Sequence, residues 1–353
     1  MDTMTACVLH AVGDLRCETV SRPVPGAGEV LVRVGVCGVC GSDLPRVFEH
    51  GTRTFPLIPG HEFSGTVEVT GPGTDEQWID RSVAVFPLIP CRQCACCEIG
   101  AYAQCIDYDY LGSRRDGAFA EYVCVPEWNL IAIPEGLSIE EAAMAEPAAV
   151  AAHALRRAGV EPGGSVLIFG AGPIGLFLAQ WARAWGVSTV MLVDIDPAKL
   201  RFAKGLGFTH LLDPSAGDVP EWVRKKTRHG ADLVIEGSGS TAAYELAMLA
   251  ARPFGSVVLM GNPLGPMTLS QDGYWALLRK ELRVLGTWNS TCTALSVSDW
   301  RLALEAMASQ TINAAGLITH RTSLSRLHER LVMMRDKTEF FNKVMFVADS
   351  GDE

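Results

Sequence analysis

A glycine pattern, G-x-G-x-x-G, stands at positions 170, 172 and 175 and leaves few folds open to this chain. It directly follows the apolar run VLIF and opens a segment with helical periodicity that ends near Trp185. In such a strand–turn–helix the glycines allow a tight turn, a close approach of a pyrophosphate and close packing of the helix, whose free N–H groups face the phosphates. The sequence therefore predicts a dinucleotide-binding turn that includes Gly170, Gly172, Pro173, Ile174 and Gly175.

The next apolar run, VMLVD, ends at Asp194. A carboxylate at this point accepts hydrogen bonds from the adenosine ribose and repels a 2'-phosphate, so it favours NAD over NADP. Lys199 and Arg201 follow closely and are able to relax that preference. We therefore expect NAD as the cofactor.

From residue 164 onward, short apolar runs alternate with longer helical segments, which is typical of a parallel sheet with crossover helices. The strands expected in this sheet are residues 165–169, 189–193, 210–212, 232–235, 256–260 and 282–285. Earlier residues form short strands between glycines and prolines, expected at 29–36, 62–69, 82–86 and 120–125, and the run 343–347 resembles them. The fold class is therefore α/β: a β-rich domain in residues 1–157, an inserted doubly wound parallel-sheet domain in 158–288, and a return to the first domain in 289–353.

The charge balance argues against several classes of partner. The chain has 353 residues and a formal net charge of -10, which repels nucleic-acid phosphates and anionic lipids. The N-terminal residues lack the pattern of a signal peptide, and no apolar run approaches the length that spans a bilayer. We expect a cytoplasmic protein that binds a small molecule rather than a nucleic acid or a membrane.

Eleven cysteines suit metal binding better than disulfides in a reducing compartment. Cys91, Cys94, Cys97 and Cys105 form a C-x2-C-x2-C-x7-C run, which supplies a closed tetrahedral shell for a structural Zn2+. Cys96 breaks the spacing and is interpreted as a spare. A cluster of free thiols or a redox disulfide pair is the alternative.

A second set of possible ligands is spread more widely: Cys40 in GVCGSD, His61 and Glu62 in PGHEFSG, and Glu146 in AEPAAV. Each has an ordinary structural interpretation when taken singly. Together they offer the mixture of sulfur, nitrogen and oxygen donors that an open catalytic zinc site uses.

The order of GVCGSD, GHEFSGTV, the four-cysteine loop, AEPAAVAAHA and GAGPIG resembles that of the zinc-containing medium-chain dehydrogenases over essentially the whole chain. Within that family the chain resembles the polyol dehydrogenases. The segments GSDLPRVF, PLIPCRQC and YLGSRRDGAFAEYV are similar to those of enzymes that act on a polyol phosphate of the galactitol 1-phosphate type.

The resemblance implies a GroES-like catalytic domain, a Rossmann domain, a substrate cleft between them and a dimer or tetramer. It implies two Zn2+ per chain, with the catalytic ion held by Cys40, His61 and a carboxylate. We expect Glu146 as this third ligand, with Glu62 exchanging with it or supporting it. The implied reaction is oxidation of a secondary alcohol by NAD, in which zinc acts on the hydroxyl as a Lewis acid.

Several roles stay open at this stage. Ser42 is a candidate to accept the alcohol proton or a turn-stabilising hydroxyl, and Asp43 is a supporting or turn residue. Arg114 and Arg115 are candidates for a substrate phosphate. The alternative is that they form surface ion pairs with Asp116 or Asp109, and that Arg46 supplies the charge instead. The alternative functions are a sorbitol- or iditol-type dehydrogenase of free polyols, a zinc-free reductase and a noncatalytic nucleotide-binding protein.

Overall fold

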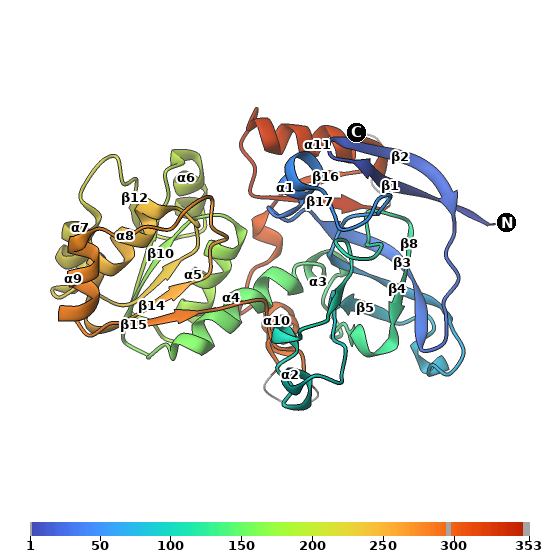
Figure 1. Ribbon diagram of the computed structural model, residues 1–353, viewed down its shortest axis with the longest axis horizontal. Helices are drawn as coiled ribbons and strands as arrows, with labels where there is room; N and C mark the ends of the chain where they lie inside the picture. The colour runs from blue at the N-terminus through green and yellow to red at the C-terminus, as the bar shows by residue number, and fades with distance from the viewer. Residues whose placement is uncertain (1, 294–297, 349–353) are drawn as a thin grey trace. The chain divides into compact units, whose positions relative to one another are not determined.

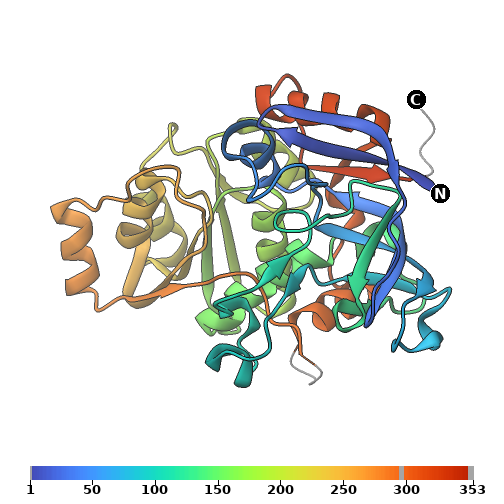
Figure 2. The same ribbon diagram turned by 45° about the vertical axis from the view of Figure 1, so that its right-hand side comes forward.

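The chain forms two compact units, seen from two directions in Figures 1 and 2. A computed structural model describes residues 2–293 and 298–348. The first unit comprises Met1–Glu146 and Thr291–Glu353, and the second comprises Pro147–Ser290. The first division falls within helix α4 (Ala145–Ala158), earlier than the boundary at 157 that the sequence suggested. The sequence suggested the later boundary because its glycine and proline residues follow this helix rather than precede it.

The second unit is built on a six-stranded parallel sheet with the order β12-β11-β10-β13-β14-β15. Its strands are β10 (Ser165–Phe169), β11 (Thr189–Val193), β12 (His210–Leu212), β13 (Ala231–Glu236), β14 (Ala251–Leu259) and β15 (Arg283–Gly286). Every residue of β10 is buried, as expected of a central parallel strand covered on both faces. This is the doubly wound order of a Rossmann sheet, and the predicted fold class is confirmed.

Helices connect these strands, and their first residues explain where they begin. They are α5 (Pro173–Ala184), α6 (Pro197–Gly205), α7 (Val219–Thr227), α8 (Thr241–Ala250) and α9 (Gln271–Arg279). Asp196 and Asp218 cap α6 and α7 by accepting backbone N–H groups, and each of these helices has a proline in its first turn. Ser240 caps α8 in the same way.

The first unit contains a seven-stranded sheet with the order β16-β17-β3-β4-β5-β9, in which β8 also pairs with β3. Its strands are β3 (Glu29–Gly38), β4 (Glu62–Thr70), β5 (Ser82–Val85), β8 (Tyr122–Pro126), β9 (Leu130–Ala132), β16 (Ile318–Thr322) and β17 (Lys343–Val347). β17 is antiparallel to β3, so residues 343–347 belong to the same sheet as residues 29–38. β9 and β16 were not predicted from the sequence.

Shorter elements surround this sheet. The strands β1 (Thr3–Ala11) and β2 (Asp14–Ser21) form a hairpin, and β6 (Leu88–Ile89) pairs with β7 (Asp109–Tyr110). The helices are α1 (Asp43–Pro45), α2 (Ala95–Glu98), α3 (Ile139–Ala142), α10 (Asp299–Ala308) and α11 (Leu324–Asp336), with a π-helical turn at Arg46–His50. Among the described residues, no helix combines the length and apolar character needed to cross a bilayer.

One end of the sheet brings distant parts of the chain together. Gly38, the last residue of β3, lies opposite both Glu62 on β4 and Met345 on β17. A Cβ on Gly38 would stand 2.6 Å from Glu62 Oε2 and 2.7 Å from Lys343 Cε, so a side chain here would displace the ends of these two side chains. The residues that follow β3, precede β4 and begin β17 therefore share one small region.

Candidate metal centre and dinucleotide turn

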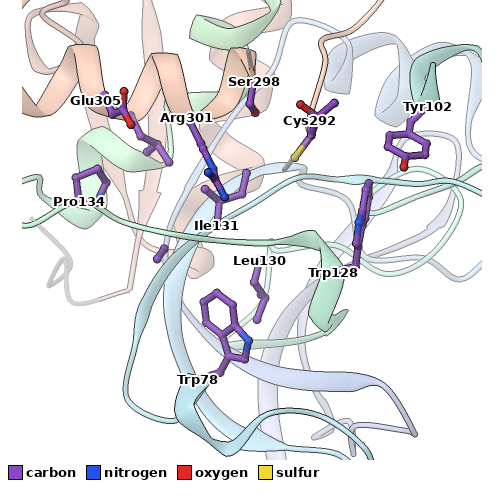
Figure 3. A pocket seen from close by; sticks show the side chains of 13 residues that line it. Trp78, Tyr102, Trp128, Leu130, Ile131, Pro134, Cys292, Ser298, Arg301 and Glu305 are labelled. Carbon is purple, nitrogen blue, oxygen red and sulfur yellow. The ribbon is translucent and has the colours of Figure 1, made fainter. Parts of the chain in front are cut away.

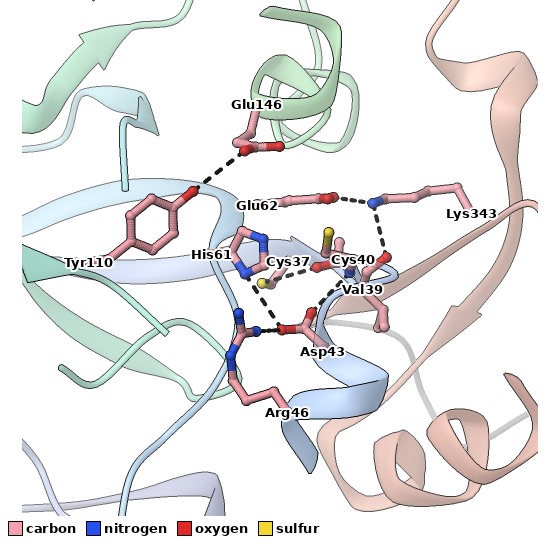
Figure 4. A network of polar contacts seen from close by, with 11 residues as sticks. Cys37, Val39, Cys40, Asp43, Arg46, His61, Glu62, Tyr110, Glu146 and Lys343 are labelled. Carbon is pink, nitrogen blue, oxygen red and sulfur yellow. Dashed lines mark hydrogen bonds and ion pairs between the residues drawn. The ribbon is translucent and has the colours of Figure 1, made fainter. Parts of the chain in front are cut away.

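Cys40, His61 and Glu62 form a compact group at this end of the sheet (Figure 4). One ligand atom from each lies within 4.8 Å of the others. Cys40 follows β3, while His61 and Glu62 stand at the start of β4. A thiol, an imidazole and a carboxylate are donor types that Zn2+ accepts, and three of them leave a coordination position open. The donor set therefore fits a catalytic zinc ion.

Asp43 contacts two of these three residues, Cys40 and His61. Its fully buried carboxylate accepts the backbone N–H of Cys40 at 2.9 Å and has Oδ1 3.5 Å from His61 Nδ1. The same oxygen accepts a hydrogen bond from Arg46. Burial works against ionisation of Asp43, but the charges of His61 and Arg46 outweigh it and lower its pKa. Because Nδ1 faces Asp43, Nε2 of His61 is the nitrogen left for a metal ion.

Lys343 holds Glu62. Its ammonium donates to Glu62 Oε2 and, at 3.0 Å, to the carbonyl oxygen of Val39. Burial disfavours the charged lysine, but Glu62 reverses this effect and raises its pKa. Sequence alone did not indicate this contact, because a lysine that begins an apolar strand carries no local sign that it is buried against a carboxylate.

Glu146 stands apart from the compact group, although the sequence ranked it ahead of Glu62 as the third ligand. It lies in the first turn of α4, where its Oε1 is 3.5 Å from the hydroxyl of Tyr110. Burial and the nearby charge of Glu62 raise its pKa to about 7. Tyr110 was not among the predicted residues, and its ring also packs edge-on against His61 with centroids 5.8 Å apart.

The thiol groups of Cys91, Cys94, Cys97 and Cys105 converge on one loop, and Cys96 lies outside this group. The Cys94 sulfur lies 3.5 Å from that of Cys97 and 3.9 Å from that of Cys105, and the Cys91 and Cys97 sulfurs are 4.0 Å apart. Tetrahedral Zn2+ with sulfur at its usual distance has S–S edges of about 3.8 Å. Backbone N–H groups of Ile106 and Cys97 lower the pKa of Cys94 to about 6, which favours a thiolate. The loop therefore fits a structural zinc ion.

The glycine turn has the shape that a pyrophosphate needs. Gly170 has φ 102°, and a Cβ on Gly175 would stand 1.9 Å from the Gly170 carbonyl oxygen, so both positions require glycine. A Cβ on Gly172 would project into open space, which leaves this face of the turn free for a ligand. Pro173 and Ile174 begin α5 directly after the turn.

Asp194 follows β11, and its carboxylate supports the same turn. It accepts the N–H groups of Ala171 at 2.7 Å and of Asp196 at 2.8 Å. Its two oxygens are therefore fixed beside the glycines by backbone donors. The residues of the turn fit a dinucleotide.

Both candidate phosphate-binding arginines have protein partners. Arg114 donates to the carbonyl oxygen of Tyr108 at 2.5 Å and lies 3.7 Å from the centre of that ring. Arg115 donates to Glu29 at 2.8 Å. Asp116, one of the two ion-pair partners considered for these arginines, instead accepts the N–H of Ile58.

Ser42 and Arg46 lie on the segment that follows Cys40. Ser42 is half-buried and precedes α1, and its hydroxyl does not cap this helix. The Arg46 side chain is 16% exposed and lies beside Asp43 and His61 (Figure 4). Within the described parts of the chain, Asp43 is the only hydrogen-bond partner of its guanidinium group, so Nε and Nη2 retain free donors.

A separate cavity of about 590 Å3 lies in the first unit, lined by Trp78, Trp128, Cys292 and Arg301 among others (Figure 3). Its lining includes Tyr102 of the thiol loop but no residue of the Cys40, His61 and Glu62 group. It is therefore distinct from the candidate metal centre.

Two family models match the chain. The alcohol dehydrogenase GroES-like domain matches residues 26–135, and the zinc-binding dehydrogenase matches residues 173–309. Galactitol 1-phosphate 5-dehydrogenase from Escherichia coli (strain K12) is 36% identical over 308 residues, covering 87% of this chain and 89% of that protein. Sorbitol dehydrogenase from Bacillus subtilis (strain 168) is 34% identical over 266 residues, covering 74% and 75%.

Solved structures of related dehydrogenases are also similar to this chain. The crystal structure of galactitol-1-phosphate dehydrogenase from Escherichia coli is 34% identical with a TM-score of 0.91, covering 98% of this chain and 100% of that one. A structure from Sinorhizobium meliloti 1021 bound to NADP is 31% identical with the same TM-score and the same coverage. The fold, the metal-donor groups and these matches place the chain in the class of zinc-dependent dehydrogenases that use a nicotinamide cofactor. The chain belongs to the polyol dehydrogenase branch of the zinc-containing medium-chain dehydrogenase family.

Proposed function

We propose that the enzyme oxidises a secondary alcohol of a polyol phosphate to the ketone and passes the hydride to NAD. The observation that carries this proposal is the convergence of Cys40, His61 and Glu62 beside the partly free guanidinium of Arg46. The first three are zinc donors, and the fourth is a donor for an anionic group on the substrate.

Zinc bound here would act as a Lewis acid on the substrate oxygen. The protein contributes the geometry: Asp43 orients His61, and Lys343 neutralises and holds Glu62. Ser42, two residues after Cys40, is proposed to receive the alcohol proton. The contacts favour Glu62 as the carboxylate of the metal site, with Glu146 as the group that exchanges with it.

A second zinc ion in the four-thiol loop is proposed to be structural, which gives two per chain. Its closed donor set offers no position to a substrate. The sulfur separations support this assignment, because they approximate a tetrahedron of the size that zinc needs.

NAD is proposed as the cofactor because Asp194 presents a carboxylate at the end of β11, where it repels a 2'-phosphate. A related structure is bound to NADP, which makes NADP the competing candidate.

The phosphate preference is supported by the name of one relative, galactitol 1-phosphate 5-dehydrogenase, and by the position of Arg46. Arg114 and Arg115 are the other candidates, but their contacts with Tyr108 and Glu29 compete with a ligand. The related sorbitol dehydrogenase supports the alternative, oxidation of an unphosphorylated polyol.

The test compares kcat/KM for a hexitol phosphate and the free hexitol in the parent enzyme, Arg46→Gln and the matched control Arg115→Gln. We expect the parent to prefer the phosphate, and Arg46→Gln to lower the ratio of the two values by about 10- to 100-fold, as for loss of one charge-assisted contact. The ratio cancels any general damage to Asp43 and His61. A ratio lost in Arg115→Gln but kept in Arg46→Gln would assign the phosphate to Arg115. Equal values in the parent would favour a dehydrogenase of free polyols.

A further inference from the structure

Two cysteines outside the metal sites face each other across the N-terminal hairpin. Cys7 on β1 lies directly opposite Cys17 on β2. In the sequence they are scattered residues, and neither belongs to a candidate metal group among the described residues. The hairpin fold is what makes them neighbours.

The backbone pairing at this position brings the two side chains close together. The N–H of Cys7 donates to the carbonyl oxygen of Phe119 at 2.8 Å, and the N–H of Leu9 donates to that of Leu57 at 2.8 Å. These residues of β1 therefore turn their backbone groups away from β2, so Cys7 and Cys17 form a non-hydrogen-bonded pair. Such pairs have Cα atoms about 4.5 Å apart, at the short end of the roughly 4.4–6.8 Å span of disulfides.

The two thiols differ in environment. Cys7 is 1% exposed, and its sulfur donates to the carbonyl oxygen of Leu324 at 3.3 Å. Cys17 is exposed. The neighbouring thiol of Cys7 lowers the pKa of Cys17 to about 7, whereas the pKa of Cys7 is raised. Cys17 is therefore the accessible nucleophile and Cys7 the protected thiol beside it.

We propose that Cys7 and Cys17 are a redox-active dithiol that closes to a disulfide by exchange with a small-molecule disulfide of the glutathione type. The Cys17 thiolate attacks one sulfur of the oxidant, breaks its S–S bond and releases one thiolate. That thiolate takes the proton of Cys7. The Cys7 sulfur then attacks the Cys17 sulfur, breaks the mixed disulfide and releases a second thiolate, which takes from solvent the proton that Cys17 had given up on ionisation. In total, one external disulfide is reduced to two thiols while two cysteines are oxidised to one disulfide.

The test treats the zinc-loaded enzyme with oxidised glutathione, alkylates the remaining thiols and maps the tryptic peptides without reduction. Trypsin cleaves after Arg16, and the Arg22–Pro23 bond resists it, so the proposed bridge links peptides 1–16 and 17–33. We expect this linked pair, loss of two reactive thiols and unchanged zinc content. Reduction by dithiothreitol should restore both thiols.

Three variants separate the steps. Cys17→Ser should leave Cys7 unmodified, and Cys7→Ser should hold one glutathione on Cys17. Cys124→Ser, which removes a half-buried cysteine opposite Leu31, should form the bridge like the parent. The proposal is overturned if the parent keeps glutathione on Cys17 as Cys7→Ser does, or if neither cysteine reacts while the fold is intact.

Discussion

The ammonium group of Lys343 donates to the carboxylate of Glu62, and both side chains are 2% exposed. The pair joins the first residue of β17 to the first residue of β4, so β17 fixes a candidate zinc ligand. A carboxylate held in this way neither swings into solvent nor lacks a counter-charge when the metal ion is absent.

Lys343→Met should destabilise the protein because it leaves the Glu62 carboxylate buried without its partner. We expect the free energy of unfolding to fall by about 3 kcal/mol, measured by urea denaturation. The double variant Lys343→Met/Glu62→Gln, in which no charge is stranded, should lose less. A single variant as stable as the parent would show that the pair does not stabilise the fold.

Glu146 should make the stability of the metal-free protein depend on pH. Its folded-state pKa is raised from 4.5 to about 7, so the native state binds more protons than the unfolded state between these values. Stability from this group is therefore present at low pH and is lost as pH rises through about 7. Relative to the parent, Glu146→Gln should gain stability between about pH 5 and about pH 7.5 in urea unfolding of chelated protein. Parallel pH profiles would contradict this expectation.

Mutations should distinguish the roles of the two proposed zinc ions. Cys40→Ala should abolish turnover and leave the fold largely intact, whereas Cys97→Ala should lower thermal stability because the thiol loop loses the binding free energy that helps it fold. Elemental analysis should find about two zinc ions per parent chain and about one in each variant. Normal melting of Cys97→Ala together with unfolding of Cys40→Ala would reverse the assignment.

Replacing Asp194 should shift cofactor use. Asp194→Ser removes the charge that repels a 2'-phosphate, so the ratio of kcat/KM with NADP to that with NAD should rise about tenfold or more. Asp194→Asn is the matched control for the backbone contacts, because its amide oxygen still accepts the N–H of Ala171 or Asp196. A parent enzyme that already prefers NADP would show that Lys199 and Arg201 override the carboxylate.

Local patterns were enough to predict much of the fold. The runs 165–169, 189–193, 210–212 and 343–347 begin and end as strands at the expected residues, because each is an apolar run bounded by turn residues. The glycine turn could also be predicted, because its strand, turn and helix are contiguous in the sequence.

Contacts between residues far apart in the sequence could not be predicted from local patterns. Lys343 is 281 positions from Glu62, and Tyr110 is 36 from Glu146, so no spacing rule joins either pair. Arg115 pairs with Glu29, 86 positions away, rather than with the adjacent Asp116. The sequence therefore indicated which residue types could bind metal and phosphate, but the tertiary structure decides which of them are free to do so.

Reduction of NAD by a hexitol phosphate, followed at the nicotinamide absorbance before and after chelation, measures metal-dependent hydride transfer directly. We expect turnover that is lost when a chelator removes the accessible zinc and restored when Zn2+ is added back, with no turnover in Cys40→Ala under any condition. Full activity in protein shown by elemental analysis to be free of zinc, or equal activity in Cys40→Ala, would contradict the account.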